Sequence, residues 1–233
     1  MTSVANGWQL AIFDCDGVLV DSEAITHQVL VDALGDLGLK IDLGEAFDLF
    51  MGNTLQQTIG IVENRLGGPL PEGFFPQWRE RLYATFRELP VQSVSGVEQV
   101  LREVTCPACV VSNGPLAKMR TTLGVTGLLN QFEGKLFSAE SGWPGKPAPD
   151  LFIAAAAEFG VLPEQTFVVE DSPTGVRGGI AAGMFVFGYA GADHTDAGAL
   201  AAEGAQVFTD MRELPALIAA ASDSGTAGGR GRS

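Results

Sequence analysis

The feature that most constrains this chain is a short apolar run that ends abruptly in two carboxylates. Residues 10–13 (Leu-Ala-Ile-Phe) lead directly into Asp14, with Asp16 and Gly17 close behind. An apolar run without polar alternation predicts a strand that is buried on both faces, as in a parallel sheet covered by helices. Ligands of such sheets bind outside the carboxyl ends of the strands. We therefore expect Asp14 and Asp16 to lie where chemistry takes place.

Two carboxylates at this spacing repel each other unless a cation neutralises them. Oxygen ligands beside a glycine turn suit Mg²⁺, a hard ion that takes few protein carboxylates and keeps room for water and phosphate oxygens. The alternative is a solvated turn in which Asp14, Asp16 and Gly17 only shape the backbone. The pattern alone does not separate these interpretations, so the rest of the chain must decide between them.

The composition is that of a globular protein and limits its partners. The 233 residues, 46% of them hydrophobic, suffice for one large domain or for a core with an insert. A net charge of −14 argues against nucleic acid and against an anionic membrane as partners. Three cysteines give no disulfide framework, and no run reaches the ~18 apolar residues of a membrane span. We expect a cytoplasmic protein whose oligomeric state is open, with a monomer as the simple case.

The alternation of predicted elements indicates the fold class. Residues 21–90 show helical periodicity, whereas strand and helix patterns alternate from residue 95 onward. Such alternation predicts an α/β fold with a doubly wound parallel sheet, a Rossmann-like core. Strands are expected at 10–13, 109–112, 136–137, 167–170, 185–187 and 207–208, and core helices at 97–104, 115–123, 149–159 and 173–182.

The helical segment is an insert in this core. It begins just after the first strand, above the carboxyl end of that strand, so we expect an all-helical cap that acts as a lid. Glycines and prolines divide it into helices expected at 22–37, 45–50, 54–66 and 73–88. We assign residues 1–20 and 91–221 to the catalytic core, 21–90 to the cap and the Ser- and Gly-rich 222–233 to a flexible tail.

Three later positions carry polar residues beside predicted strands or helices. Ser112 and Asn113 precede a helix whose free N–H groups, together with the hydroxyl and the amide, form a seat for phosphate. Lys146 stands in a proline-rich loop ahead of another helix, and Glu170 and Asp171 end a further strand. Each also has an ordinary structural interpretation, as a turn, a solvated lysine or an acid at a helix start.

Two other functions fit the residues poorly. The glycine-rich stretch 175–183 is not a dinucleotide loop, because carboxylates stand where the pyrophosphate would bind. The chain has only two histidines, His27 in the predicted cap and His194 in a late loop. A Ser-His-Asp hydrolase is therefore poorly supported.

Taken in order, the polar motifs resemble those of the haloacid dehalogenase superfamily. The resemblance is to the branch with a helical cap after the first strand, which includes β-phosphoglucomutase and many sugar phosphatases, and it covers about residues 8–215. Each motif is weak alone, but the set in this order is highly specific. The motifs are Asp14-Cys15-Asp16-Gly17, Ser112-Asn113-Gly114, Lys146-Pro147 and Glu170-Asp171-Ser172.

The resemblance implies a role for each motif. It implies that Asp14 is the nucleophile and forms an aspartyl-phosphate. It implies that Asp16 protonates the leaving alcohol and then activates water, while its main-chain carbonyl binds Mg²⁺. The other implied residues are Asp171 as the remaining carboxylate on the metal, Glu170 as a ligand through water, and Ser112, Asn113 and Lys146 on the phosphoryl oxygens.

Within the superfamily the resemblance favours a phosphatase. Dehalogenases lack the second aspartate of the first motif, so Asp16 argues for phosphoryl transfer. Mutases of the β-phosphoglucomutase kind carry a Lys-Gly-x-x-Arg pattern in the cap, and the corresponding residues 51–55 (Met-Gly-Asn-Thr-Leu) have neither base. A sugar phosphate mutase stays the alternative. A phospho-acceptor signalling domain is argued against by the length of the chain and by the cap.

The resemblance also bears on the substrate. Residues 109–119 and 135–138 are similar to the 6-phosphogluconate phosphatases of this branch, which implies a small phosphorylated sugar or sugar acid with its phosphate on a primary carbon. A sugar acid carries a second anionic group, so some cation of the acidic cap must face it. We nominate Arg79, ahead of Arg81, on the helix expected at 73–88. The alternative is that both arginines are solvated surface residues.

Overall fold

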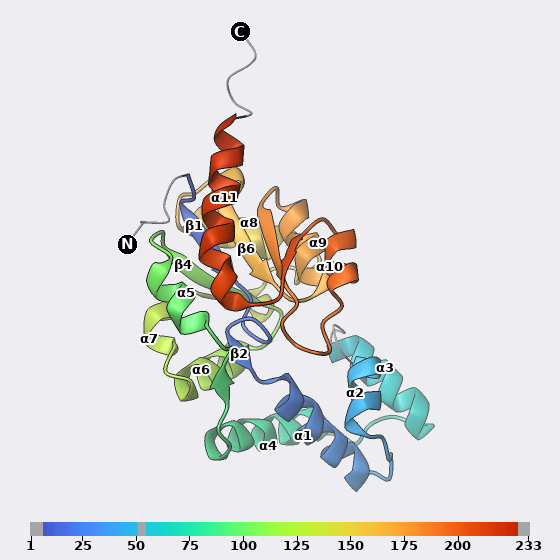
Figure 1. The fold of residues 1–233 in the computed structure, drawn as a ribbon. Coiled ribbons are helices and arrows are strands. Elements are labelled where there is room, and N and C mark those ends of the chain that lie inside the picture. Colours follow the sequence, from blue (N-terminus) through green and yellow to red (C-terminus); the bar gives the residue numbers. More distant parts are fainter. Residues whose placement is uncertain (1–6, 51–54, 228–233) are drawn as a thin grey trace.

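The protein consists of a parallel sheet between two layers of helices, with the helices α1–α4 set apart as a cap (Figure 1). The computed structural model describes residues 7–50 and 55–227. The stretch 51–55, from which we argued against a mutase, lies outside these ranges except for its last residue. The expected fold class, a doubly wound parallel sheet with an inserted helical cap, is confirmed.

The order of the strands places β1 inside the sheet. Across the sheet the strands are β5 (Leu136–Ser138), β4 (Ala108–Ser112), β1 (Leu10–Phe13), β6 (Thr166–Glu170), β7 (Phe185–Tyr189) and β8 (Gln206–Phe208), and all pairs are parallel. Ile12 of β1 lies opposite Cys109 of β4 and Val168 of β6. Because the connections run away from β1 in both directions, its carboxyl end is a topological switch point, where open α/β sheets bind ligands.

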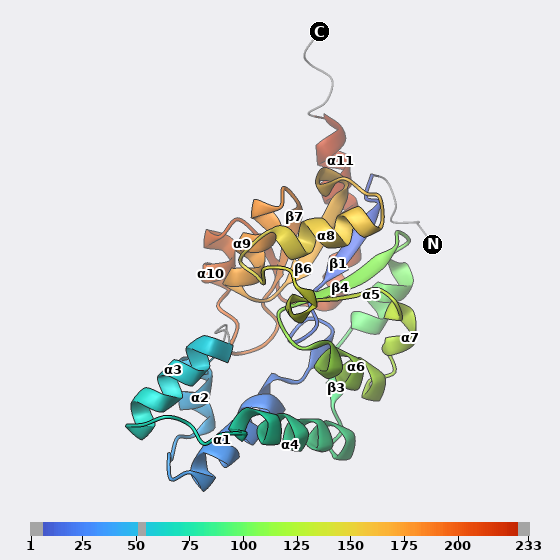
Figure 2. The same ribbon diagram turned by 180° about the vertical axis from the view of Figure 1, so that it is seen from behind.

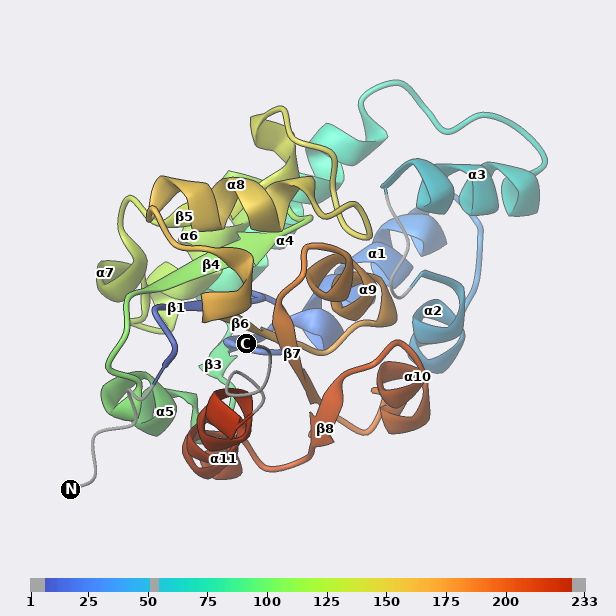
Figure 3. The same cartoon turned by 90° about the horizontal axis from the view of Figure 1, so that it is seen from above.

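Both faces of the sheet are covered, as the unbroken apolar run of β1 predicts. All four residues of β1 are fully buried, with Ala11 and Phe13 in one core cluster and Leu10 and Ile12 in the other. Figure 3 shows α8 and α11 on opposite sides of the sheet. One layer holds α5 (Val97–Glu103), α6 (Leu116–Val125), α7 (Leu129–Phe132) and α11 (Leu214–Ala227), and the other holds α8 (Asp150–Glu158), α9 (Pro173–Ala181) and α10 (Ala197–Ala202).

The cap has an apolar core of its own. This cluster joins α1 to α2 and α3, and includes Leu30, Leu34, Phe50 and Val62. The cap helices are α1 (Glu23–Asp36), α2 (Leu43–Phe50), α3 (Leu55–Leu66) and α4 (Phe74–Glu88), close to the expected bounds. Helix α4 runs beneath α6 of the core (Figure 2), so the cap packs on the same side of the molecule as the carboxyl end of β1.

Several short elements were not predicted. The two chain crossings between core and cap form an antiparallel pair of strands, β2 (Val20–Asp21) and β3 (Gln92–Ser93). Strands of two residues are too short to show periodicity, and their pairing partners lie far apart in the sequence. The other elements for which we gave no bounds are α7, α10, α11 and the 3₁₀ turns η1 (Ala139–Ser141), η2 (Pro163–Gln165) and η3 (Met211–Glu213).

The expected tail begins too early. We placed its start at residue 222, but α11 continues to Ala227, and only 228–233 lie beyond the described residues. The helix is anchored by buried Leu214 and Ile218, and the Ser222 hydroxyl donates to the Ile218 carbonyl, 2.9 Å away. Once a packed turn exists, adding helical residues is easy, so the helix outlasts its apolar pattern. Among the described helices, none has the length and apolar character needed to cross a membrane.

Candidate active site

The polar strand ends of the core converge beside β1. Asp14 follows β1, Ser112 ends β4 and Glu170 ends β6, and β1 is paired with both of these strands. The N–H of Asp14 donates to the carbonyl of Val169, 2.9 Å away, which continues the β1–β6 ladder past the strand. Lys146 reaches the same place from the connection between β5 and α8. The structure thus brings Asp14, Ser112, Lys146 and Glu170 to the switch point.

The ammonium group of Lys146 lies at the centre of this group. Its side chain is only 3% exposed; Nζ contacts the carboxylates of Asp14 and Glu170 and donates to the Val111 carbonyl, 2.8 Å away. Burial by itself lowers the pKa of Lys146, but the two carboxylates raise it to a net value above the ordinary one. Lys146 is therefore a buried charged group rather than a solvated surface lysine.

Asn113 holds the loop that carries this lysine. Its side-chain Oδ1 accepts from the N–H of Lys146, 2.7 Å away, and its Nδ2 donates to the carbonyl of Lys146 at 3.0 Å. A Cβ at Gly145 would lie 2.7 Å from that Oδ1, so the close approach requires glycine. We expected the Asn113 amide on a phosphoryl oxygen. Its contacts with the backbone of Lys146 use one hydrogen of Nδ2 and leave the second for such a contact.

Ser112, the last residue of β4, precedes Asn113 and is buried. The residue is 3% exposed, and its Oγ accepts from the N–H of Gly114 at 3.0 Å. That bond uses the oxygen as an acceptor, so the hydroxyl hydrogen can be donated to an anion. The geometry suits the expected contact of Ser112 with a phosphoryl oxygen.

Three carboxylates form a cluster that fits a divalent cation. Ligand oxygens of Asp14, Glu170 and Asp171 lie within 4.8 Å of one another. Burial raises the pKa of Asp14 to about 7, against the lowering effect of Lys146. Burial, then the charges of Glu23 and Asp14, raise the pKa of Asp171 well above its ordinary value. Buried carboxylates that repel one another and offer oxygen ligands are the donor set that Mg²⁺ prefers.

The members of the cluster differ in what they already bind. Glu170 is fully buried and uses one oxygen on Lys146 and the other on the hydroxyl of Ser172, 3.0 Å away. Asp171 instead packs against Gly17, where a Cβ would lie 1.9 Å from its Oδ2 and the backbone φ is +78°. Only glycine fits this position, so the turn after Asp16 is shaped by the need to bring Asp171 close.

Asp16 is not a member of this cluster, and it contacts a residue that we did not predict. Its Oδ1 accepts from the Ser22 hydroxyl and lies 2.9 Å from Nζ of Lys118, whose side chain is 14% exposed. Burial opposes the charge of Lys118, but Asp16 raises the pKa of Lys118 to a net value above the ordinary one. One sequence signal could have found it: Lys118 lies in the first turn of α6, where the helix dipole disfavours a cation.

Both histidines of the chain meet at one contact between core and cap. Nε2 of His194, in the connection after β7, lies 2.6 Å from Oε2 of Glu23, the first residue of α1. The His194 ring stacks on Phe47 of α2, with centroids 4.9 Å apart and planes 14° apart. The His27 ring also contacts Phe47, with centroids 4.6 Å apart, and its Nδ1 is 2.9 Å from the carbonyl of Glu23. No sequence pattern had connected these residues.

The two nominated cap arginines face in different directions. Arg79 reaches the core, where its NH1 lies 3.7 Å from the carboxylate of Glu140 in η1. Arg81 pairs inside the cap with Asp32 and Asp36 of α1, at 3.5 and 3.1 Å. Tyr83 of the same helix is close enough to Arg79 and Glu140 to interact with their charges, and its pKa is raised mainly by burial. Both arginine side chains are partly exposed.

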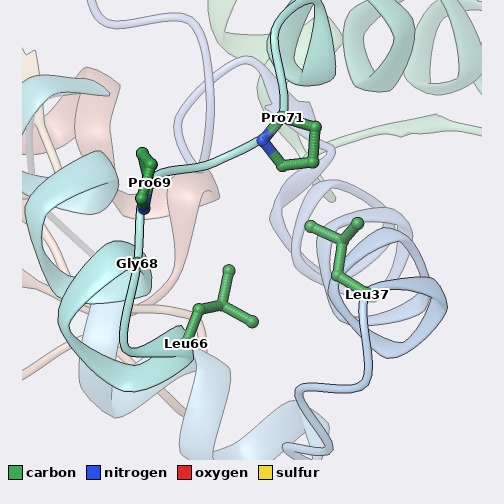
Figure 4. Close-up of a pocket in the computed structure, with 5 residues that line it drawn as sticks. All are labelled: Leu37, Leu66, Gly68, Pro69 and Pro71. Carbon is green, nitrogen blue, oxygen red and sulfur yellow. The ribbon is translucent and has the colours of Figure 1, made fainter.

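The pocket drawn in Figure 4 does not belong to this site. It lies on the cap between the end of α1 and the α3–α4 connection, and the described residues that line it are apolar or glycine. Their side chains offer no group for acid, base or metal chemistry. The carboxylate cluster at the end of β1 is therefore the better candidate for the active site.

The chain is similar to known phosphatases along nearly its whole length. The family profile of haloacid dehalogenase-like hydrolases matches residues 8–183. The 6-phosphogluconate phosphatase of Escherichia coli (strain K12) is 34% identical over 209 residues, which are 90% of this chain and 94% of that protein. The fructose-1-phosphate phosphatase of the same organism is 28% identical over 177 residues, 74% of this chain and 92% of that protein.

A solved structure has the same arrangement of core and cap. A haloacid dehalogenase-like protein from Agrobacterium tumefaciens strain C58, of unknown function, superposes with a TM-score of 0.81 at 38% identity. The superposition covers 93% of this chain and 100% of that chain, so it includes the cap as well as the sheet.

Proposed function

Because the chain belongs to the haloacid dehalogenase-like hydrolases, we propose that it removes the phosphate group of a small sugar or sugar acid with the help of Mg²⁺. The expected superfamily is confirmed, and the phosphatases among its relatives make the chain a phosphoric monoester hydrolase. The observation that carries the proposal is the convergence of Asp14, Lys146 and Asp171 at the switch point of the sheet.

The proposed reaction has two steps on one aspartate. In the first, a carboxylate oxygen of Asp14 attacks phosphorus, the bond from phosphorus to the sugar oxygen breaks, and Asp16 gives that oxygen a proton. In the second, Asp16 takes a proton from water as the water attacks the aspartyl-phosphate. Inorganic phosphate leaves, and both carboxyl groups return to their starting forms. Asp16 is close enough to Asp14 for its charge to act on that carboxyl group, which supports this division of labour.

The charges around Asp14 suit phosphoryl transfer. Transfer needs positive charge on the equatorial oxygens of the phosphoryl group, and in this acidic chain Lys146 supplies it at the nucleophile. Ser112 is placed to donate a hydrogen bond to the same group, and Asn113 keeps the lysine loop in position. Asp14, Asp171 and the main-chain carbonyl of Asp16 would hold Mg²⁺, with Glu170 acting through water. When bound, the ion neutralises charge that develops on the phosphoryl oxygens.

The substrate class rests on the relatives and on the cap. The two named relatives act on 6-phosphogluconate and on fructose 1-phosphate, which both carry phosphate on a primary carbon. Arg79 extends from the cap toward the core and is paired only loosely with Glu140, 3.7 Å away. We assign it to the carboxylate of a sugar acid, since that anion can replace Glu140 as its partner.

A panel of phosphate esters assayed with Mg²⁺ tests the proposal. Wild type should release inorganic phosphate from 6-phosphogluconate or a similar sugar phosphate, and Asp14→Asn, purified in parallel, should not. Turnover of no sugar phosphate would overturn the substrate class. Formation of an isomeric sugar phosphate without free phosphate would point to the mutase alternative instead.

A further inference from the structure

The two carboxylate oxygens of Asp16 have different surroundings. Oδ1 accepts from the hydroxyl of Ser22 and lies 2.9 Å from Nζ of Lys118. Oδ2 faces the loop after β4, because a Cβ at Gly114 would lie 3.7 Å from Oδ2 and 3.2 Å from the Oγ of Ser112. One oxygen is thus held by two donors, while the other lies near Gly114, in the loop that follows Ser112.

From this geometry we infer that Lys118 is a positioning residue that fixes the Asp16 carboxyl group so that Oδ2 carries the proton to the leaving oxygen. The inference rests on the proposed function, in which Asp16 is the general acid. A proton resides poorly on an oxygen that already accepts from an ammonium and a hydroxyl, so Oδ2 is the oxygen left for proton transfer. The orientation of Oδ2 is then determined by the groups that bind Oδ1, which are Ser22 and Lys118.

The surroundings of Lys118 suit this task better than a direct contact with the phosphate. Lys118 projects from the first turn of α6, and its side chain is 14% exposed, so its position is fixed by packing. Ser22 alone could hold Oδ1 in more than one orientation, because a hydroxyl rotates. The second donor, on a different element of the core, removes that freedom. Holding the Asp16 carboxyl group in one orientation raises the rate only of steps in which Asp16 transfers a proton.

A positioning role of Lys118 can be distinguished from a merely structural one by comparing leaving groups that need a proton with leaving groups that do not. A sugar alkoxide leaves only if Asp16 protonates it, whereas acetate or 4-nitrophenolate leaves without a proton. Loss of orientation should therefore lower kcat/KM, which reports the first chemical step, for sugar phosphates far more than for acetyl phosphate or 4-nitrophenyl phosphate. A general fault of folding or of phosphate binding would lower both equally.

The experiment measures kcat/KM of wild type, Lys118→Met and Lys118→Arg on the best sugar phosphate of the panel and on the activated ester. Lys118→Met should lose about 10²-fold on the sugar phosphate, the lower part of the range for general acid catalysis, and less than tenfold on the activated ester. Lys118→Arg keeps a charged donor and should recover most of the loss. Lys135→Met is the matched control. It removes a lysine at the surface of the catalytic core, where Nζ is 3.4 Å from the Gln131 carbonyl, and it should leave kcat/KM unchanged on both esters.

The outcomes separate this inference from the proposed function. Equal losses on both esters in a variant that circular dichroism shows to be folded, or no loss on either, would overturn the role of Lys118 alone. If Lys118→Met does not fold, Lys118→Gln takes its place with the same expected selectivity. Absence of wild-type turnover on every ester would overturn the proposed function and this inference with it.

Discussion

Nε2 of His194 lies 2.6 Å from Oε2 of Glu23, so a loop of the core is joined to the first residue of the cap by an ion pair. The bond to Glu23 raises the pKa of His194 above its ordinary value, with Asp21 and Asp193 acting in the same direction and burial acting against them. The pair connects the two parts of the molecule through a group that titrates near neutral pH.

Stability should depend on pH through this pair. Because the folded-state pKa of His194 is raised above its unfolded value of about 6.5, its contribution is fully present below that pH and is lost as pH rises through the folded pKa. His194→Gln should therefore destabilise the metal-free protein at pH 6, by about 1 kcal/mol or less for a partly exposed pair, and much less at pH 9. Denaturant unfolding of both proteins measures the difference.

The control for this measurement is a Glu23→Gln background. There the His194→Gln change should have nearly the same effect at both pH values, because the carboxylate that raises the pKa is gone. A difference that is equally large at pH 6 and pH 9 in the wild-type background would show that the contact is held by the stacking on Phe47 rather than by charge.

Asp14→Asn should abolish phosphate release and leave the fold intact. The amide is nearly the same size but is a very weak nucleophile, and Lys146 keeps Glu170 as a charged partner. Steady-state assays with the best ester, together with circular dichroism, test both parts. Turnover above about one part in 10³ of wild type, once contamination is excluded, would assign the nucleophile elsewhere.

Asp16→Asn should separate proton transfer from metal binding. Its side chain faces Ser22 and Lys118, so the loss should be ~10²–10⁴-fold in rate while Mg²⁺ affinity stays close to that of wild type. Calorimetric titration of Mg²⁺ beside the rate assay gives both numbers. Lost Mg²⁺ binding in this variant would mean that the side chain, and not the main-chain carbonyl, is the ligand.

Activity should require Mg²⁺, and its binding should weaken in acid. Since burial raises the pKa of Asp14 to about 7, protons compete with the ion for this ligand, and the affinity should be higher at pH 8 than at pH 6. Chelation should abolish turnover, Mg²⁺ should restore it, and Ca²⁺, with its looser coordination, should not. Undiminished rates in chelator, or affinities that do not change with pH, would contradict the site.

Arg79→Ala should change substrate choice, whereas Arg81→Ala should not. The two arginines lie on one helix, but only Arg79 extends toward the core, so Arg81 is the matched control. Arg79→Ala should lower kcat/KM about tenfold more for 6-phosphogluconate than for glucose 6-phosphate, because only 6-phosphogluconate has a carboxylate that can pair with Arg79. Equal losses on both substrates would remove Arg79 from substrate selection.

Local patterns were enough to predict the fold and the meeting of several polar residues at one edge of the sheet. The unbroken apolar run before Asp14 requires a strand covered on both faces, and the positions of Ser112, Lys146 and Glu170 beside other elements place them at the same sheet edge. These predictions succeed because parallel strands carry their carboxyl ends to one edge whatever the loops do.

Contacts between distant elements could not be predicted in this way. His194, Phe47 and Glu23 belong to a core loop and two cap helices, and their meeting depends on how the cap is set on the core. The contact of the Asn113 amide with the backbone of Lys146, 33 residues later, was likewise not predicted. Such partners follow from tertiary geometry, which periodicity does not record.

The short ladder of β2 and β3 determines how the cap can move. Both chain crossings pass through it, with Val20 opposite Ser93 and Asp21 opposite Gln92, so the two attachments of the cap lie one strand spacing apart, about 4.8 Å. Two connections that are hydrogen-bonded side by side resist rotation of the cap about the strand axis, but they can bend together. We therefore expect the cap to move as one unit about this ladder, and to present the same residues of α4 to the site each time it approaches the core.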